Sequence, residues 1–215
     1  MFVRIAIALL LFTAMARATE PRDIAFLLDP IRDKFRVPGL AAAVIRDGKL
    51  EAIGAAGVRR AGRPEPLAIG DTFHIGSCTK AMTCVLAATL VEDGAIDWDS
   101  TVGQVLAEVA DMHAGWRNIT LEQLLTHRGG APAELPAMAF TTRMGNTDQG
   151  RRGIVAHVLR QPPSNVGQFV YSNTGYVIAG RMLEVAAGAS WEDLMRQRLF
   201  EPLGMTSAGF GAPGL

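Results

Sequence analysis

The sequence predicts an α+β fold in which an antiparallel hairpin of strands stands beside several helices. Asp47-Gly48 separates two apolar runs, and Asp-Gly in that setting is typical of a two-residue hairpin turn. Residues 21–36 carry apolar side chains at helical spacing and residues 77–93 are apolar almost all round, so both stretches predict helices. Of the 215 residues, 49% are apolar and 20% are charged, which excludes intrinsic disorder and allows a sizeable core.

Turn-forming residues end each of these early elements. Val37-Pro38-Gly39 stops the first helix, because proline cannot continue a helix and glycine permits a turn. Gly94 ends the apolar helix in a similar way. The two strands, and the loop rich in Gly, Pro and Arg that follows them, are expected at residues 40–45, 50–57 and 57–70.

Capping residues mark three further helices. Thr120 and Gln123 have the spacing of a capping box, which predicts a short helix at this point. Gly188 and Ser190 separate two longer apolar stretches, and a serine before such a stretch is a common N-cap. These two helices are expected at residues 174–187 and 190–200. The long polar stretch 128–150 is expected to be a loop over a cleft or surface.

The first eighteen residues have the order of a secretory signal peptide. Arg4 precedes an apolar run at residues 5–12, and the small residues Ala16 and Ala18 precede the expected cleavage site. An N-terminal membrane anchor is the alternative, but this run is too short to span a bilayer. We therefore expect a periplasmic or secreted protein whose domain runs from residue 19 to residue 215, with no membrane span after cleavage.

The composition gives no support for several classes of partner. The chain has 21 basic and 21 acidic residues, so there is no electrostatic case for nucleic acid or an anionic membrane. Its four histidines show no metal-site spacing, and no metal is expected. Cys78 and Cys84 are six residues apart on one predicted helix, on different faces and too far apart for a disulfide. Cys78 is expected to be a packed free thiol.

Ser77 and Lys80 open the apolar helix and are the first candidate for catalysis. Residues three apart share a helix face, so the hydroxyl and the amine can meet. The free N–H groups and positive potential of a helix N-terminus stabilise an oxyanion, and a lysine can serve as the base that activates a hydroxyl. The structural alternative is that Ser77 is an N-cap and Lys80 a solvated residue of the first turn.

Tyr171 and Asn173 form a second candidate, at the junction that leads into the helix expected from residue 174. A tyrosine there can bring its phenol to a lysine-bearing site and carry a proton. An asparagine amide can hold a substrate carbonyl and the lysine together. The structural alternative is that Asn173 caps the helix and Tyr171 packs.

Taken in order along the chain, these motifs resemble the serine β-lactamase-related family, which includes class C β-lactamases, D-alanyl-D-alanine carboxypeptidases and esterases. The resemblance covers nearly the whole chain after residue 24. It rests on Phe73-His74-Ile75-Gly76-Ser77-Cys78-Thr79-Lys80, Leu124-Leu125-Thr126-His127, Tyr171-Ser172-Asn173-Thr174-Gly175-Tyr176 and Glu201-Pro202-Leu203-Gly204-Met205.

The resemblance implies a penicillin-recognising fold and a role for each candidate residue. Ser77 would be the acylated nucleophile and the backbone donor of an oxyanion hole, Lys80 its activating base, Tyr171 a proton relay and Asn173 a substrate-binding amide. A β-lactam, a D-Ala peptide (a peptidoglycan-like substrate) or an ester could each supply the carbonyl. The family works without metal or cofactor.

The chain departs from the family pattern in its third motif, Lys-Thr/Ser-Gly or His-x-Gly, which follows the Tyr-x-Asn motif in the family. Here His-x-Gly occurs only at His113 and His127, both before Tyr171. The resemblance therefore implies the N-terminal portion of such a domain, a hairpin and a mostly helical lobe without the remaining strands of the sheet. A hairpin alone makes no stable sheet. We expect this chain by itself to be weakly active or inactive, and a non-catalytic periplasmic binding protein on the same scaffold is the alternative.

A second departure follows His127, where the chain has Arg128-Gly129-Gly130 and the family often has Thr-Ser-Gly. The glycines are explained by a tight turn. A lone histidine is more often a packing residue than a ligand. His127 is therefore expected to be structural and is given no catalytic role.

Overall fold

A computed structural model describes residues 20–135 and 148–211 of the chain. The chain divides into two compact units at the junction of Asp71 and Thr72, and each unit is described by itself. The expected signal peptide lies outside the described residues. No helix within the described ranges has both the length and the apolar character needed to cross a membrane.

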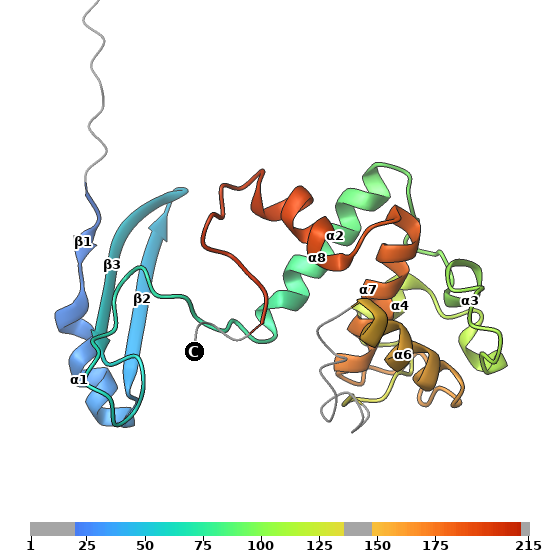
Figure 1. The fold of residues 1–215 in the computed structure, drawn as a ribbon, viewed down its shortest axis with the longest axis horizontal. Coiled ribbons are helices and arrows are strands. Elements are labelled where there is room, and N and C mark those ends of the chain that lie inside the picture. Colours follow the sequence, from blue (N-terminus) through green and yellow to red (C-terminus); the bar gives the residue numbers. More distant parts are fainter. Residues whose placement is uncertain (1–19, 136–147, 212–215) are drawn as a thin grey trace, which may run out of the picture. The chain divides into compact units, whose positions relative to one another are not determined.

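The first unit holds a three-stranded sheet, in the order β1-β3-β2 (Figure 1). Strands β2 (Gly39–Arg46) and β3 (Lys49–Gly57) are antiparallel, and β1 (Arg22–Asp23) is parallel to β3. Asp47 and Gly48 have φ of 50° and 71°, the pair of positive angles that a type I′ turn needs. The predicted hairpin is confirmed, and β1 was not predicted because two residues are too few for an alternating pattern.

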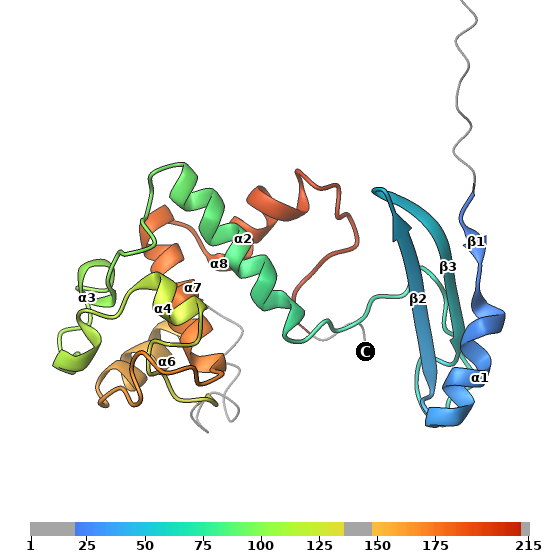
Figure 2. The ribbon, with the colours of Figure 1, turned by 180° about the vertical axis from the view of Figure 1, so that it is seen from behind.

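Helix α1 (Ala25–Phe35) packs against β3 (Figure 2). Ala52, Gly54 and Ala56 on β3 are buried in strict alternation, as expected for one covered sheet face. A Cβ on Gly54 would lie 2.6 Å from the Ala25 nitrogen, so the glycine permits this close approach. The helix begins at residue 25 and not at 21, because the residues before it pair as β1.

The apolar stripe predicted on this helix is buried only in part. Leu28 is buried, whereas Leu27, Ile31 and Phe35 are 51%, 46% and 66% exposed. The helical spacing was therefore correct, but the expectation that the whole stripe lies on something is not met within this unit.

The second unit is helical (Figure 1). Along the chain its elements are α2 (Cys78–Glu92), α3 (Val102–Val105), η1 (Ala114–Trp116), α4 (Leu121–Leu125), α6 (Asp148–Leu159), α7 (Asn173–Ala187), α8 (Trp191–Met195) and the π-helical turn η3 (Arg196–Phe200).

Helix α7 lies at the centre of this unit and contacts α2, α3, α4, α6 and α8. Ile178, Met182 and Leu183 on α7 have no exposed surface, and they belong to one continuous core with Leu86 and Leu90 of α2. This packing holds α7 against α2, and near the start of α7 the Tyr176 hydroxyl lies 3.2 Å from Cys84 Sγ of α2. The two stretches that carry the candidate residues therefore meet although about ninety residues of sequence separate them.

The helices predicted at the Thr120–Gln123 capping box and at residues 174–187 are confirmed, whereas the stretch 190–200, predicted as one helix, is the short helix α8 followed by the π-helical turn η3. The capping boxes of α3 and α4 are both formed, with Thr101–Gln104 and Thr120–Gln123 as their residue pairs. Helices α3, α6 and the η1 turn were not predicted. The expected loop 128–150 is non-helical over its described part up to residue 135, and α6 begins at Asp148 near its end.

Candidate active site

Ser77 lies immediately before α2, and its side chain makes no capping hydrogen bond to the helix backbone. Its backbone is already helical, with φ −71° and ψ −5°, and its hydroxyl forms no capping bond. Gly76 before it has a positive φ of 52°, a conformation that glycine adopts at little cost. Ser77 therefore occupies the N-cap position of α2, but its hydroxyl contacts other side chains and does not cap the helix.

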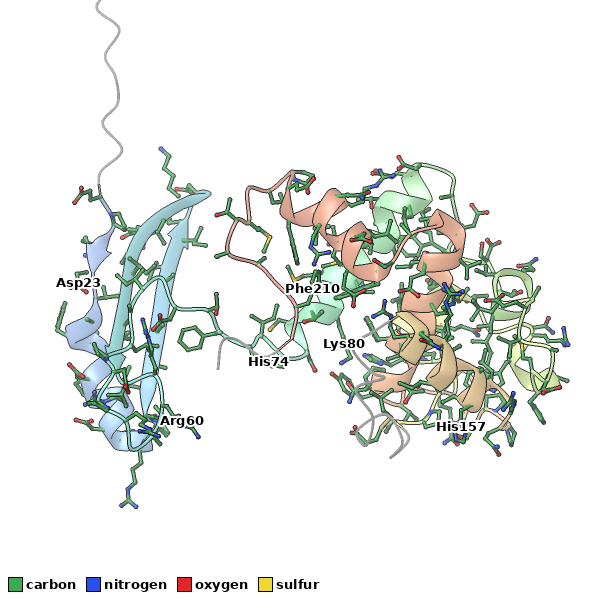
Figure 3. The ribbon with its side chains drawn as sticks, viewed as in Figure 1. Asp23, Arg60, His74, Lys80, His157 and Phe210 are labelled. Carbon is green, nitrogen blue, oxygen red and sulfur yellow. The ribbon has the colours of Figure 1, made fainter. Side chains whose placement is uncertain are left out.

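Lys80 lies one turn along α2 (Figure 3), and its amine bridges the two candidate motifs. Its Nζ donates to Ser77 Oγ at 3.2 Å and to Asn173 Oδ1 at 2.6 Å. The amine also lies over two aromatic rings, 4.8 Å from the centroid of Tyr171 and 5.5 Å from that of Tyr176. Lys80 is half-buried, so it is a packed and hydrogen-bonded group and not the solvated lysine of the alternative interpretation.

The phenol of Tyr171 is a second group in contact with the Ser77 hydroxyl. Its hydroxyl lies 2.8 Å from Ser77 Oγ, and its side chain is 44% exposed. Lys80 lowers the pKa of Tyr171, and the hydrogen bond with Ser77 lowers it further. The structure therefore brings Ser77, Lys80, Tyr171 and Asn173 into one hydrogen-bonded group.

The segment that carries Tyr171 and Asn173 is fixed by the turn after α4. Ser172, and not Asn173, is the N-cap of α7, since its Oγ accepts from the Gly175 N–H at 2.8 Å. The same Oγ donates to the Pro132 carbonyl at 2.5 Å, and the Asn173 N–H donates to the Ala133 carbonyl at 2.8 Å. Because Ser172 takes the capping role, the Asn173 side chain is left to face Lys80.

His127 holds this segment through both its backbone and its ring. Its carbonyl accepts from the Val170 N–H at 2.9 Å, and its Nδ1 accepts from the Ser172 N–H at 3.0 Å. The ring is tilted by 33° against that of Tyr171, with 4.5 Å between centroids. Burial lowers the pKa of His127, and the charge of Lys80 lowers it further, which favours the neutral ring that can accept at Nδ1. The structural role expected for His127 is therefore what its contacts show.

Tyr176 and Cys84 lie beneath the lysine. The Tyr176 hydroxyl donates to the Leu125 carbonyl at 2.8 Å and lies 3.2 Å from Cys84 Sγ. Burial raises the pKa of Tyr176, so this phenol stays protonated. Both cysteines are free, as expected, but Cys78 is exposed. The expectation of a packed thiol at Cys78 was wrong, because the first turn of α2 leaves that position open.

Glu134 is a further residue at the site that the sequence analysis missed. Its Oε2 accepts from Asn173 Nδ2 at 3.2 Å, and its backbone carbonyl accepts from Thr174 Oγ1 at 2.8 Å. Nothing local in the sequence distinguishes this glutamate from other exposed acids. Only its pairing with a residue 39 positions away reveals it.

The chemistry available here is that of an activated hydroxyl. A serine hydroxyl, a lysine amine and a phenol lie within hydrogen-bonding reach, an arrangement that can support covalent catalysis with proton transfer. Within the described ranges, no group of three or more His, Cys, Asp and Glu side chains could hold a metal ion.

Comparison with known proteins gives the family. Residues 24–215 match the family model described as Beta-lactamase. The chain therefore belongs to the β-lactamase family, and its fold is the penicillin-recognising fold of that family.

Three relatives illustrate the range of the family. Penicillin-binding protein 4 of Amycolatopsis lactamdurans is 37% identical over 183 residues, which are 82% of this chain and 46% of that protein. A protein of Aspergillus campestris named as an unguisins hydrolase is 30% identical over 197 residues, 86% of this chain and 36% of its own. The solved structure of a D-alanine carboxypeptidase from Burkholderia cenocepacia superposes with a TM-score of 0.67 and 27% identity, covering 84% of this chain and 47% of that one. The chain thus spans about half the length, or less, of these relatives.

Proposed function

We propose that this protein is a serine hydrolase in which Ser77 attacks the carbonyl carbon of its substrate. The observation that supports the proposal most strongly is the position of Ser77 Oγ between two groups able to take its proton. Lys80 Nζ lies at 3.2 Å and the Tyr171 hydroxyl at 2.8 Å. A purely structural serine at a helix start would cap the helix, and this one does not.

The reaction follows from these positions in two halves. In the first, Ser77 Oγ forms a bond to the carbonyl carbon while its proton passes to the neutral amine of Lys80 or to the phenolate of Tyr171. The bond from that carbon to the leaving nitrogen or oxygen then breaks, and the leaving atom takes up the proton. In the second half, water adds to the acyl-enzyme with loss of a proton to the same groups, and Ser77 leaves protonated. The net reaction consumes one water molecule and gives a carboxylic acid together with an alcohol or an amine.

The start of α2 supplies electrostatic support for the charged intermediate. The 15-residue helix places its positive end at Ser77. Among the described residues, no acceptor is bonded to the Ser77 backbone N–H, so this donor is available to a developing oxyanion. The Asn173 amide, held by Lys80 on one side and by Glu134 on the other, is proposed to contact the substrate.

The proposed substrates are a β-lactam, a peptide ending in D-alanine or a carboxylic ester. Each presents a carbonyl with a leaving group to one serine. The relatives' names include a penicillin-binding protein, an unguisins hydrolase and a D-alanine carboxypeptidase, which supports the class of acyl-transfer chemistry and leaves these three substrates open. We further propose that the protein works in the periplasm or outside the cell. The basis for this is the signal peptide expected at residues 1–18.

Intact-mass measurement after incubation with a fluorophosphonate and with benzylpenicillin tests the proposal. Because this chain is expected to be weakly active by itself, we expect an adduct that forms slowly and that peptide mapping locates at Ser77. The Ser77→Ala variant should form none. Ser207→Ala is the matched control, because Ser207 is exposed and remote in sequence from the candidate residues, and it should label like the wild type. Absence of any adduct in the wild type would contradict the proposal and favour a non-catalytic binding protein.

A further inference from the structure

Glu134 is held at the candidate site at two points. Its backbone carbonyl accepts from Thr174 Oγ1 at 2.8 Å, and Thr174 is fully buried in the first turn of α7. Its carboxylate Oε2 accepts from Asn173 Nδ2 at 3.2 Å. The side chain is nevertheless exposed. The result is a negative charge fixed at the site and open to a ligand.

The Asn173 amide connects this charge to the lysine. Asn173 Oδ1 accepts from Lys80 and Asn173 Nδ2 donates to Glu134, so the two ends of one amide face opposite charges. The negative charge of Glu134 raises the pKa of Tyr171, against the larger lowering by Lys80. Among the described residues, no group is hydrogen-bonded to the other carboxylate oxygen, Oε1. That oxygen is available to accept from a bound molecule.

We propose that Glu134 makes this site selective for acyl donors that carry an ammonium group on the acyl side. The proposal rests on the hydrolase function proposed above. A substrate that contacts the Asn173 amide lies next to the Glu134 carboxylate, because these two side chains are in direct contact. An ammonium group there gains a charge-assisted hydrogen bond, and a carboxylate there is repelled.

The size of the effect follows from the exposure of Glu134. A solvent-exposed ion pair contributes modestly and is screened by salt. We therefore expect the preference for a cationic over an anionic acyl group to be roughly fivefold at low ionic strength, and to shrink in high salt. A neutral acyl group should fall between the two.

Three penicillins with one nucleus provide the test. Ampicillin, benzylpenicillin and carbenicillin carry an ammonium group, a hydrogen and a carboxylate at the same carbon of the acyl side chain. The rate constant for acylation of Ser77 is measured for each by intact mass at pH 6.5, on the full chain, in low and in high salt. Glu134→Gln keeps an oxygen that can accept from Asn173 and removes the charge, whereas Glu134→Asp keeps the charge.

The informative quantity is the ratio of the ampicillin rate to the carbenicillin rate. We expect this ratio to fall about fivefold in Glu134→Gln and to lose its salt dependence, and to fall less in Glu134→Asp. Glu122→Gln is the matched control, since Glu122 is an exposed acid on α4 whose carboxylate has no hydrogen bond or ion pair to any residue that the structure describes. It should leave the ratio unchanged.

Two failures can be told apart. Equal ratios in the wild type and Glu134→Gln, with normal labelling in both, would overturn the role of Glu134 and leave the hydrolase proposal intact. No labelling of the wild type by any penicillin or by a fluorophosphonate would overturn the hydrolase proposal itself.

Discussion

The imidazole of His127 accepts a hydrogen bond from the backbone N–H of Ser172 at 3.0 Å. This bond joins the turn after α4 to the residue between Tyr171 and Asn173, so it fixes two site residues at once. His127 also adopts a positive φ of 62°, a conformation in which asparagine is tolerated better than most residues.

Replacing His127 tests whether the ring nitrogen positions Tyr171. His127→Phe keeps an aromatic ring but leaves the N–H of the buried residue Ser172 without a partner, which costs about 1–3 kcal/mol. We expect a lower free energy of unfolding and slower acylation of Ser77. His127→Asn offers an acceptor near the Nδ1 position and tolerates the backbone conformation, so it should recover most of the acylation rate. Equal acylation rates in the Phe variant and the wild type would exclude the positioning role.

The same histidine makes a pH-dependent contribution to stability. Burial and Lys80 lower its pKa in the folded protein, below the ordinary value of about 6.5 for the unfolded chain. The unfolded chain therefore binds more protons than the folded protein as the pH falls below this value, so the free energy of unfolding decreases. The loss should level off once the pH is below the folded pKa. Urea unfolding at pH 7.5 and 5.5 should show a larger decrease for the wild type than for His127→Asn, and equal decreases would contradict the assignment.

Tyr171 should have an unusually acidic phenol because of Lys80. Lys80 is the largest cause of its lowered pKa and the bond with Ser77 is the second. In Lys80→Met we expect the pKa of Tyr171 to rise toward its ordinary value of about 10. Ultraviolet titration of tyrosinate, with Tyr171→Phe subtracted, measures it. An unchanged titration in Lys80→Met would mean that the lysine does not act on this phenol.

Removing the phenol tests proton transfer directly. Tyr171→Phe keeps the ring that packs against His127 and deletes the hydroxyl that lies 2.8 Å from Ser77 Oγ. If Tyr171 carries a proton, acylation of Ser77 should slow by about 10²–10⁴-fold with little change in stability. A rate within a few fold of the wild type, measured by intact mass, would assign proton transfer to Lys80 alone.

Local signals account for the parts of the fold that could be predicted. Asp47-Gly48 demands the positive φ angles that the hairpin turn has, and Thr120 with Gln123 forms the capping box that was expected. The pairing of β1 with β3 has no such signal, because only the tertiary context brings Arg22 opposite Ala52. Helix α6 was not predicted because its buried face includes a charged residue, Arg151, so its sequence lacks a continuous apolar stripe.

The part of the candidate site that lies within one short motif could be predicted from the sequence. Ser77 and Lys80 share a helix turn, so their meeting follows from spacing alone. Their contact with Tyr171 and Asn173 depends on the packing of α2 against α7, and it was expected only from the resemblance to a family. His127 and Glu134 act through hydrogen bonds to residues 45 and 39 positions away. No local sequence pattern predicts such bonds.

Loss of Glu184 of α7 should weaken the second unit. Its carboxylate is 2% exposed and pairs with Arg151, which is 10% exposed, and it also accepts from the Trp191 N–H at 3.0 Å. Glu184→Ala leaves a buried guanidinium short of a partner, and removing one member of a buried pair costs about 3–5 kcal/mol. Glu192 remains to hold Arg151 at 2.7 Å, so we expect the lower end of that range. The free energy of unfolding, measured in urea, gives the loss.

The control for this measurement is an ion pair on the surface of the same unit. Arg198 donates to Asp93 at 2.6 Å, and the two side chains are 42% and 48% exposed. Because water screens such a pair, Arg198→Gln should cost no more than about 1 kcal/mol. Glu184→Gln keeps an acceptor for the Trp191 N–H and removes only the charge, so its loss should lie between those of the other two variants. If Glu184→Ala unfolds as late in urea as Arg198→Gln, the buried charges do not hold α6 and α8 to α7, and the apolar core alone carries the stability of this unit.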